Sequence, residues 1–318
     1  MNLHDDINGF TVLLQMISEN TGIRSDILEK DYYVTLFLKE LSGWQDTLPV
    51  YFKGGTALYK ALGSIRRFSE DIDLTVCIDG CSNSQAKSRL DKAANGYHGL
   101  PRTLSKEMEN NRKGSITSVY DYKSVLNTFV PDPLQRFNRV KVEATSFTVS
   151  EPFMSLTIAP LIFEKASEEQ KAILQDRYGI APFSVNTIKL ERIFVDKVFA
   201  SEFYYLRREY FDVSKHIYDL TVMSGLEEIQ QLISDPDGLT AMMAFKRREE
   251  KSRTGSDLSE RAASDFMIFR DIMTNKELQE RFIYMQDVYI FNDNDKIDFD
   301  EVILSLSVLR DHLLNEHL

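Results

Sequence analysis

Apolar and polar residues alternate along the chain with two different periods, which predicts a mixture of helices and strands. Between residues 11 and 41 the apolar positions recur at helical spacing, as in two amphipathic helices interrupted near Gly22. Alternation of polar and apolar residues over 71–76 and 139–145 predicts two half-buried strands, the second in a strand region over 139–147. An apolar run over 158–163 is typical of a further, buried strand.

The second half of the chain has a helical pattern almost throughout. A long helix is predicted over 188–208 and another over 211–222, and the pattern from 226 onward is helical with interruptions at turn residues. We therefore predict an α/β (α+β) fold in three parts. These are N-terminal helices over 1–44, a mixed-sheet core over 45–165 and a mostly helical domain over 166–318.

Two adjacent glycines precede a short predicted helix. Gly54 and Gly55 allow a tight turn and a close approach of the backbone to a ligand, and Thr56 follows them near the start of the helix. The N-terminal end of a helix attracts phosphate groups, because its N–H groups are unpaired and its dipole is positive there. This stretch is therefore a candidate phosphate-binding turn.

Two carboxylates, Asp71 and Asp73, share one face of the predicted strand over 71–76. Like charges so close together repel each other unless a cation lies between them, and hard oxygen ligands favour magnesium. A phosphate-binding turn followed by such a pair is the arrangement needed to hold a nucleoside triphosphate and Mg²⁺ for phosphoryl or nucleotidyl transfer. The alternative is a solvated strand face with scattered acids.

Basic residues in the helical half indicate two further anion sites. Lys197 falls on the apolar stripe of the helix over 188–208. Burial of an unpaired charge is costly, so such a lysine either reaches solvent or meets an anion, for which a triphosphate is a candidate. The densest basic cluster is either a solvated helix end or an edge that binds RNA phosphates. It contains Lys246, Arg247, Arg248, Lys251 and Arg253.

The composition narrows the functional classes. A chain of 318 residues with 43% hydrophobic residues can bury a large core. Its net charge of −11 argues against a general basic surface that coats nucleic acid, but permits a local basic groove. No apolar window is long enough to span a membrane and the N-terminus lacks signal-peptide features, so we expect a cytoplasmic protein. Cys77 and Cys81 have no second ligand pair for zinc and are expected to be free thiols.

These motifs closely resemble those of the AbiEii/AbiGii (MenT-like) family of nucleotidyltransferase toxins. The family belongs to the DNA polymerase β-like superfamily, so the resemblance implies a polymerase β-like nucleotidyltransferase core. In such a core Asp71 and Asp73 would bind metal, and Arg67 and Ser69 would join the glycine turn in binding the nucleotide. The resemblance rests on Gly-Gly-Thr-Ala-Leu from Gly54 and on Arg67-Phe68-Ser69-Glu70-Asp71-Ile72-Asp73-Leu74.

The resemblance also implies roles for residues outside these motifs. Glu143 matches the third carboxylate that completes the metal site of polymerase β-like enzymes, and Glu151 is a less well placed alternative. Lys197 and Asp219 match a lysine and an aspartate that contribute to the active site of AbiEii-type proteins. The alternative for Asp219 is an exposed ion pair with Lys215, four residues earlier.

Two other positions are compared with the family. The string from Glu29 to Val34 is similar to a segment upstream of the glycine turn in AbiEii relatives, so Lys30 or Asp31 would support the site. His216 stands where an aspartate is more typical. A lone histidine is usually structural, and no catalytic role is assigned to it.

The family implies a toxin of a toxin–antitoxin system used in phage defence. It would transfer a nucleoside monophosphate from a nucleoside triphosphate to RNA, with the 3′ end of tRNA as the expected acceptor. The implied cofactors are two Mg²⁺ ions, and the implied protein partner is a cognate AbiEi-like antitoxin. The alternatives are a small-molecule nucleotidyltransferase of the antibiotic-modifying kind and a non-catalytic nucleotide-binding protein, although the intact acid pair argues against the latter.

Overall fold

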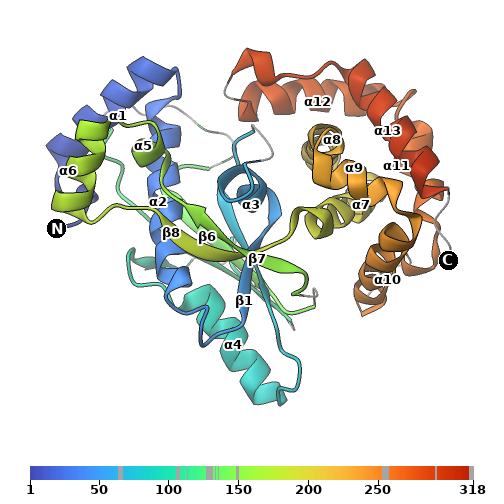
Figure 1. Ribbon diagram of the computed structural model, residues 1–318, viewed down its shortest axis with the longest axis horizontal. Helices are drawn as coiled ribbons and strands as arrows, with labels where there is room; N and C mark the ends of the chain where they lie inside the picture. Colours follow the sequence, from blue (N-terminus) through green and yellow to red (C-terminus); the bar gives the residue numbers. More distant parts are fainter. Residues whose placement is uncertain are drawn as a thin grey trace. The chain divides into compact units, whose positions relative to one another are not determined.

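The chain forms two compact units, each assembled from separate stretches of sequence (Figure 1). The first contains Met1–Ala61, Phe68–Ser146 and Phe153–Thr187, and the second contains Leu62–Arg67, Phe147–Pro152 and Ile188–Leu318. The computed structural model describes residues 1–63, 67–104, 108–112, 114–126, 132, 134, 136–147, 150–252, 258–290 and 292–314.

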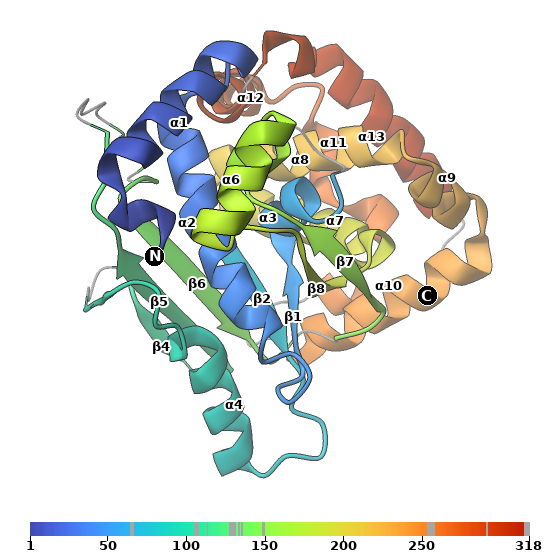
Figure 2. The same ribbon diagram turned by 60° about the vertical axis from the view of Figure 1, so that its left-hand side comes forward.

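Within the described residues, the first unit contains a mixed sheet of eight strands. Figure 2 shows β6, β2 and β1 side by side. The strand order is β3-β5-β6-β2-β1-β8-β7, and β4 pairs with β5. Strand β2 is antiparallel to β1 and parallel to β6, so it lies in the interior of the sheet. The strands are β1 (Val50–Lys53), β2 (Asp71–Val76), β3 (Arg102–Thr103), β4 (Asn110–Arg112), β5 (Ser115–Asp121), β6 (Arg139–Thr145), β7 (Phe153–Ile158) and β8 (Phe183–Ile188).

Two helices of the first unit cover one face of this sheet. Phe37 of α2 and Tyr97, just after α4, pack on the ring of Tyr120 in β5. The hydroxyl of Tyr120 donates a hydrogen bond of 2.9 Å to the main-chain oxygen of Ala94 in α4. Val140 of β6 pairs in register with Tyr120, so it points toward these helices. The residues of β6 and β2 that alternate with such positions therefore point to the opposite face of the sheet. The helices of this unit are α1 (Ile7–Thr21), α2 (Ser25–Ser42), α3 (Gly54–Lys60), α4 (Asn83–Asn95), α5 (Leu161–Glu164) and α6 (Glu168–Tyr178).

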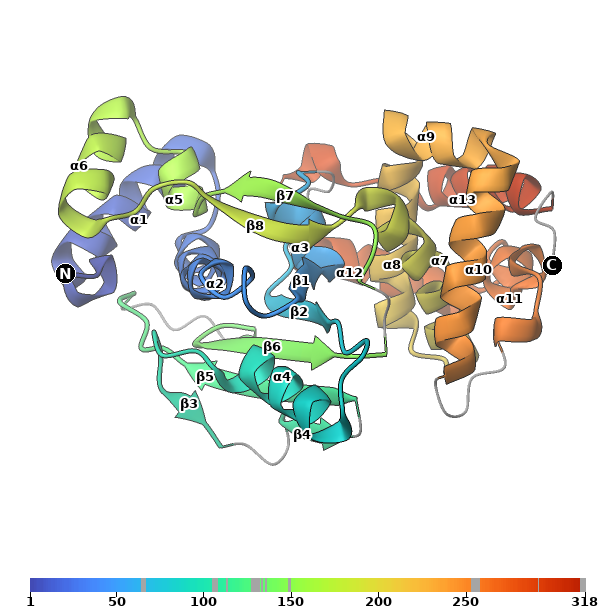
Figure 3. The same cartoon turned by 60° about the horizontal axis from the view of Figure 1, so that its bottom comes forward.

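The second unit is helical in its described part (Figure 3). Helix α8 is its central element, because it packs against α7, α12 and α13. The helical second half and the mixed sheet confirm the predicted α/β (α+β) class. The helices are α7 (Leu190–Leu206), α8 (Tyr210–Ser224), α9 (Glu227–Ser234), α10 (Pro236–Ser252), α11 (Met267–Asp271), α12 (Lys276–Tyr289) and α13 (Phe299–Leu313).

The strand predicted over 158–163 is wrong. Strand β7 ends at Ile158, and α5 begins at Leu161. Pro160 adopts an extended conformation as the N-cap, and its carbonyl accepts hydrogen bonds from the N–H groups of Phe163 and Glu164. An apolar run of this length fits a buried strand or a buried helical turn equally well, and here the proline selects the helix.

Candidate active site

The three acids predicted to bind metal lie on one face of neighbouring strands in the first unit. The parallel register of β2 and β6 sets Asp71 beside Lys141 and Asp73 beside Glu143. On the other side of β2, Lys53 of β1 pairs with Asp73. Because residues paired in register point to the same side of a sheet, these side chains share the face opposite to α2 and α4.

Burial and neighbouring carboxylates disfavour the charged form of Asp73 on this acidic face. Burial raises the pKa of Asp73 to about 7, and the charges of Glu143 and Asp71 act in the same direction. Asp71 Oδ2 lies 2.8 Å from Lys141 Nζ. Burial alone would lower the pKa of Lys141, but the surrounding carboxylates raise it. The alternative acid, Glu151, is exposed and belongs to the second unit.

Gly54, the first residue of α3, approaches the carboxylate of Asp73 closely. It has a φ of +78°, and a Cβ atom at this position would lie 2.1 Å from Asp73 Oδ2. Thr56 is buried, and its Oγ1 lies 2.9 Å from Ser69 Oγ and donates to the main-chain oxygen of Asp71. The hydroxyl of Thr56 therefore joins α3 to the start of β2, while Ser69 stays partly exposed.

A buried ion pair anchors α3, whose second residue, Gly55, is also buried. The carboxylate of Asp31 on α2 accepts hydrogen bonds of 2.7 and 2.8 Å from Lys60 Nζ at the end of α3. It also accepts from the N–H of Leu161 at 2.6 Å and from the hydroxyl of Tyr59 at 3.1 Å. Asp31 thus links α2, α3 and α5. The sequence indicated Asp31 as a supporting residue, but nothing in it identified Lys60 as the partner.

Lys30 is buried next to the same strands. Its amine donates to the main-chain oxygen of Arg139, the first residue of β6. Burial lowers the pKa of Lys30 to about 8, and the charges of Asp71 and Glu70 oppose this shift. After Lys53 and Lys141, Lys30 is therefore a third lysine that contributes positive charge near Asp71.

A second charged cluster lies inside the second unit. Asp219 of α8 is fully buried and binds Arg67 through two hydrogen bonds of 2.7 Å, from Nε to Oδ1 and from Nη2 to Oδ2. Lys197 Nζ of α7 lies 2.9 Å from Asp219 Oδ2. Burial alone would raise the pKa of Asp219, but Arg67 and Lys197 outweigh it and hold the pKa at about 2. One carboxylate thus holds two cations, and the cluster keeps a net positive charge.

The exposed ion pair considered for Asp219 is therefore wrong. Lys215 pairs with Asp212 at 2.7 Å instead. His216 packs parallel to the ring of Tyr204 with 5.2 Å between ring centroids. Burial and the positive charge of Lys197 keep the pKa of His216 well below its ordinary value, so the imidazole is neutral.

The predicted RNA-binding edge on α10 is wrong for Lys246. Its side chain is 5% exposed, and Nζ lies within 3.3 Å of the carboxylates of Asp196, Glu249 and Glu250. A lysine enclosed by three acids is not available to RNA.

The other residues of this basic cluster differ in exposure. Arg247 is half-buried and donates to the main-chain oxygens of Ser259 and Arg261. Arg248 is exposed and stacks over the ring of Phe245, and Lys251 is an exposed partner of Glu260. Arg253 lies outside the described residues.

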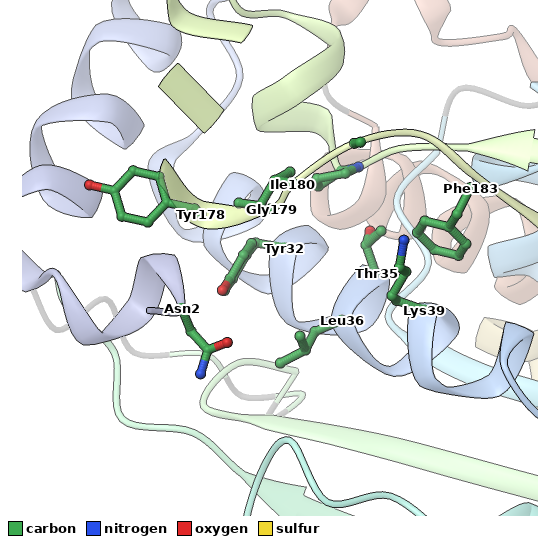
Figure 4. A pocket seen from close by; sticks show the side chains of 11 residues that line it. Asn2, Tyr32, Thr35, Leu36, Lys39, Tyr178, Gly179, Ile180 and Phe183 are labelled. Carbon is green, nitrogen blue, oxygen red and sulfur yellow. The ribbon is translucent and has the colours of Figure 1, made fainter. Parts of the chain in front are cut away.

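A pocket of about 170 Å³ opens in the first unit between α2 and the segment that follows α6 (Figure 4). Lys39 Nζ lies 4.9 Å from the ring centre of Phe183 at one end of it. None of the residues predicted to bind a nucleotide or metal lines this pocket. Its lining consists of Asn2, Tyr32, Thr35, Leu36, Lys39, Pro160, Tyr178, Gly179, Ile180, Ala181 and Phe183.

No helix in the described part of the chain is long and apolar enough to cross a membrane.

Residues 36–303 match the family model of the nucleotidyl transferase AbiEii toxin of type IV toxin–antitoxin systems. One similar solved structure is that of MenT4, a nucleotidyltransferase toxin from Mycobacterium tuberculosis H37Rv. It is 15% identical, the alignment covers 94% of this chain and 98% of MenT4, and the TM-score is 0.45. No curated protein sequence gives a significant match.

Proposed function

The chain belongs to the AbiEii family of nucleotidyltransferase toxins of type IV toxin–antitoxin systems, and from this we propose that it transfers a nucleoside monophosphate from a nucleoside triphosphate to RNA. The 3′ end of tRNA is the proposed acceptor. The observation that carries the proposal is the register of β2 and β6, which aligns Asp71, Asp73 and Glu143 on one face beside Gly54. A cognate antitoxin, a role in phage defence and a cytoplasmic location belong to the same proposal.

The acidic face fits divalent cations. Its donors are carboxylate oxygens, which suit Mg²⁺. Burial, followed by the charges of Glu143 and Asp71, raises the pKa of Asp73, and a bound cation would stabilise its charged form. Among the residues that the structure describes, no three His, Cys, Asp or Glu side chains converge as ligands of one ion. Lys141 pairs with one oxygen of Asp71. Two bound Mg²⁺ ions would offset phosphate charge and activate the acceptor hydroxyl.

Residues around α3 are proposed to hold the phosphates. Gly54 leaves room at the carboxylate of Asp73, and Ser69 presents a partly exposed hydroxyl beside Asp71. Thr56 keeps α3 and β2 in place through its buried hydroxyl. The ion pair of Asp31 with Lys60 holds the other end of the helix. Most of the rate enhancement would then come from positioning and electrostatics.

The cationic cluster of the second unit is proposed, from the family resemblance, to contribute to catalysis. Lys197 and Arg67 supply two positive charges against the one negative charge of Asp219. Asp219 then acts as a positioning residue, because both of its oxygens are taken by these cations. Exposed basic residues of α10, Arg248 and Lys251, are proposed to contact RNA phosphates.

The test is transfer of label from each α-labelled nucleoside triphosphate to total tRNA in the presence of Mg²⁺. The wild type is expected to label tRNA with at least one nucleotide, and the Asp71→Asn/Asp73→Asn variant is expected to lose the label. The Asp79→Asn variant is a matched control, since Asp79 is an exposed acid just beyond β2. If no nucleotide labels tRNA, tRNA is not the acceptor. If the double variant labels tRNA as well as the wild type does, the two acids are not required for the reaction.

A further inference from the structure

Lys141 occupies a position on the acidic face that the proposed reaction does not yet use. It lies on β6, two residues before Glu143 and in register with Asp71 of the neighbouring strand. Its amine is 2.8 Å from Asp71 Oδ2. The strand alternation that presents Glu143 to the site therefore also presents a lysine to it.

The two partners of this ion pair are both accessible. The side chain of Lys141 is 32% exposed and that of Asp71 is 35% exposed, so the flexible four-carbon stem of the lysine has room to move. Lys30 provides a contrast within the same unit. It is 1% exposed, and its amine is held by the main-chain oxygen of Arg139. Lys141 is thus a lysine beside the acids that is able to change its partner.

We propose that Lys141 exchanges partners during substrate binding: its amine holds Asp71 in the free protein and moves to a phosphate oxygen of the nucleoside triphosphate when a divalent cation takes Asp71. The inference rests on the proposed function. No covalent bond forms or breaks in this exchange. The amine leaves one carboxylate oxygen and pairs with one phosphate oxygen, and the cation replaces it on Asp71.

The exchange makes metal binding and nucleotide binding depend on each other. A cation without nucleotide must displace the amine of Lys141 from Asp71 and leaves that amine without its anion. When the triphosphate is present, the displaced amine gains a new anionic partner. Metal alone should therefore bind weakly, and metal and nucleotide together should bind more tightly than either alone, by a factor on the order of 10, as for other coupled sites.

The first experiment measures how fast Lys141 reacts with an amine-acetylating ester, by peptide mass spectrometry. Reaction is expected to be slow in the free protein, several-fold faster with Mg²⁺ alone, and slow again with Mg²⁺ and α,β-methylene analogues of ATP, GTP, CTP and UTP, each tested in turn. Lys39, an exposed lysine of the same unit, is the internal control. An unchanged rate at Lys141 under conditions where Mn²⁺ binding is detected by electron paramagnetic resonance would overturn the exchange.

Variants test the coupling itself. Lys141→Met is expected to bind Mn²⁺ alone more tightly and to lose the cooperativity between Mn²⁺ and nucleotide. Lys53→Met removes a positive charge in register with Asp73 and is expected to keep the cooperativity. Cooperativity that persists in Lys141→Met would overturn the proposal. Lys141→Arg, which keeps the charge, is expected to restore part of the cooperativity and guards against a folding defect in the methionine variant.

The outcomes separate this inference from the proposed function. If the wild type labels tRNA but Mg²⁺ leaves the reactivity of Lys141 unchanged, the exchange fails and the transfer activity stands. If no acceptor is labelled but Mg²⁺ alone exposes Lys141 and the nucleotide analogue protects it again, the exchange stands and the proposed acceptor fails.

Discussion

Gly54 and Asp73 illustrate how a single missing side chain shapes the acidic face. The carboxylate of Asp73 fills the space that a Cβ atom on Gly54 would need, and the backbone of Gly54 has a positive φ. Both observations require glycine at this position. The glycine turn is therefore needed for the shape of the protein itself, before any phosphate is bound.

We predict that Gly54→Ala abolishes nucleotide transfer and lowers the free energy of unfolding by more than the roughly 1–2 kcal/mol of backbone strain, because the new methyl group displaces Asp73. Gly22→Ala is the matched control. Gly22 has a φ of +74°, and a Cβ atom there would have no other atom within 4 Å. Denaturant unfolding and label transfer are measured on both variants. Equal losses in the two would mean that the contact with Asp73 is unimportant.

The pKa of Asp73 predicts a pH dependence of stability. The folded-state pKa of about 7 lies above the ordinary value of 3.8, so the folded protein binds this proton more tightly than the unfolded chain. This contribution to stability is complete below the ordinary pKa and is lost as the pH rises through about 7. In metal-free protein, Asp73→Asn should therefore be more stabilising at pH 8 than at pH 5. A stabilisation that does not change with pH would contradict the assignment.

At this scale the sequence predicts which residues carry the chemistry better than it predicts their partners. The alternation over 71–76 places Asp71 and Asp73 on one face, as the structure does. It says nothing of Lys141 as the neighbour of Asp71, because the register of two strands about 70 residues apart depends on the whole sheet. Glu143 could be predicted only through the family resemblance.

Among the elements, α8 is stabilised by a fully buried carboxylate. Asp219 is enclosed by Arg67 and by Lys197 from α7. Its pKa of about 2 lies below the ordinary value of 3.8, so its contribution to stability is present above pH 3.8 and is lost as the pH falls toward 2.

Asp219→Asn should lower the free energy of unfolding by about 3–5 kcal/mol at pH 7, because it leaves two buried cations without their anion. Asp212→Asn on the same helix removes a partly exposed pair with Lys215 and should cost no more than about 1 kcal/mol. The difference between wild type and Asp219→Asn should shrink below pH 3.8. Chemical unfolding across this pH range checks both statements, and similar losses for the two variants would refute the buried pair.

Helix α10 gives a similar comparison between two lysines. Lys246→Met should destabilise the protein by about 3–5 kcal/mol, since the buried Glu250 would lose the amine of Lys246. Asp196 and Glu249 would keep their pairs with Arg192. Lys251→Met, at an exposed position, should change stability by no more than about 0.5 kcal/mol. Thermal and urea unfolding distinguish them. If Lys246→Met weakens RNA binding without a loss of stability, its placement in the interior is contradicted.

The prediction of elements failed where a short pattern had two solutions. The apolar run over 158–163 forms a strand end and a helical turn, and no strand is predicted over 183–188, where the structure has β8. The basic cluster on α10 had the spacing of a solvated helix end. The spacing does not reveal that Lys246 is enclosed by acids from α7 and from the helix itself.

At the scale of the whole molecule, the two units are interleaved in sequence. The second unit takes Arg67 from the first half of the chain and pairs it with Asp219, 152 residues later. The predicted domain boundaries at residues 44 and 165 divide the chain into consecutive segments, and such a division cannot represent interleaved units. The hydrophobic pattern predicts local elements, whereas a distant ion pair leaves no periodic signal in the sequence.

Induced expression in a bacterial host tests the toxin as a whole. The wild type is expected to arrest growth, because the proposed modification of tRNA would block translation, and Asp71→Asn is expected to be harmless at the same protein level. Asp79→Asn should arrest growth like the wild type. Growth curves with immunoblots measure both quantities. Growth arrest by Asp71→Asn would show that toxicity does not depend on the acidic face.

The position of β8 in the sheet has a consequence for synthesis on the ribosome. Strand β1 pairs with β8 on one side, and β7 reaches the sheet through β8, although β1 and β7 both precede β8 in the chain. About 130 residues separate the end of β1 from the start of β8, so at 5–20 residues per second the nascent sheet has an open edge for roughly 7–26 s. That edge carries the apolar residues Val50 and Phe52, and unpaired edges of this kind invite association between chains. The yield of folded protein should therefore depend more on protection of the nascent chain during this interval than on the stability of the completed fold.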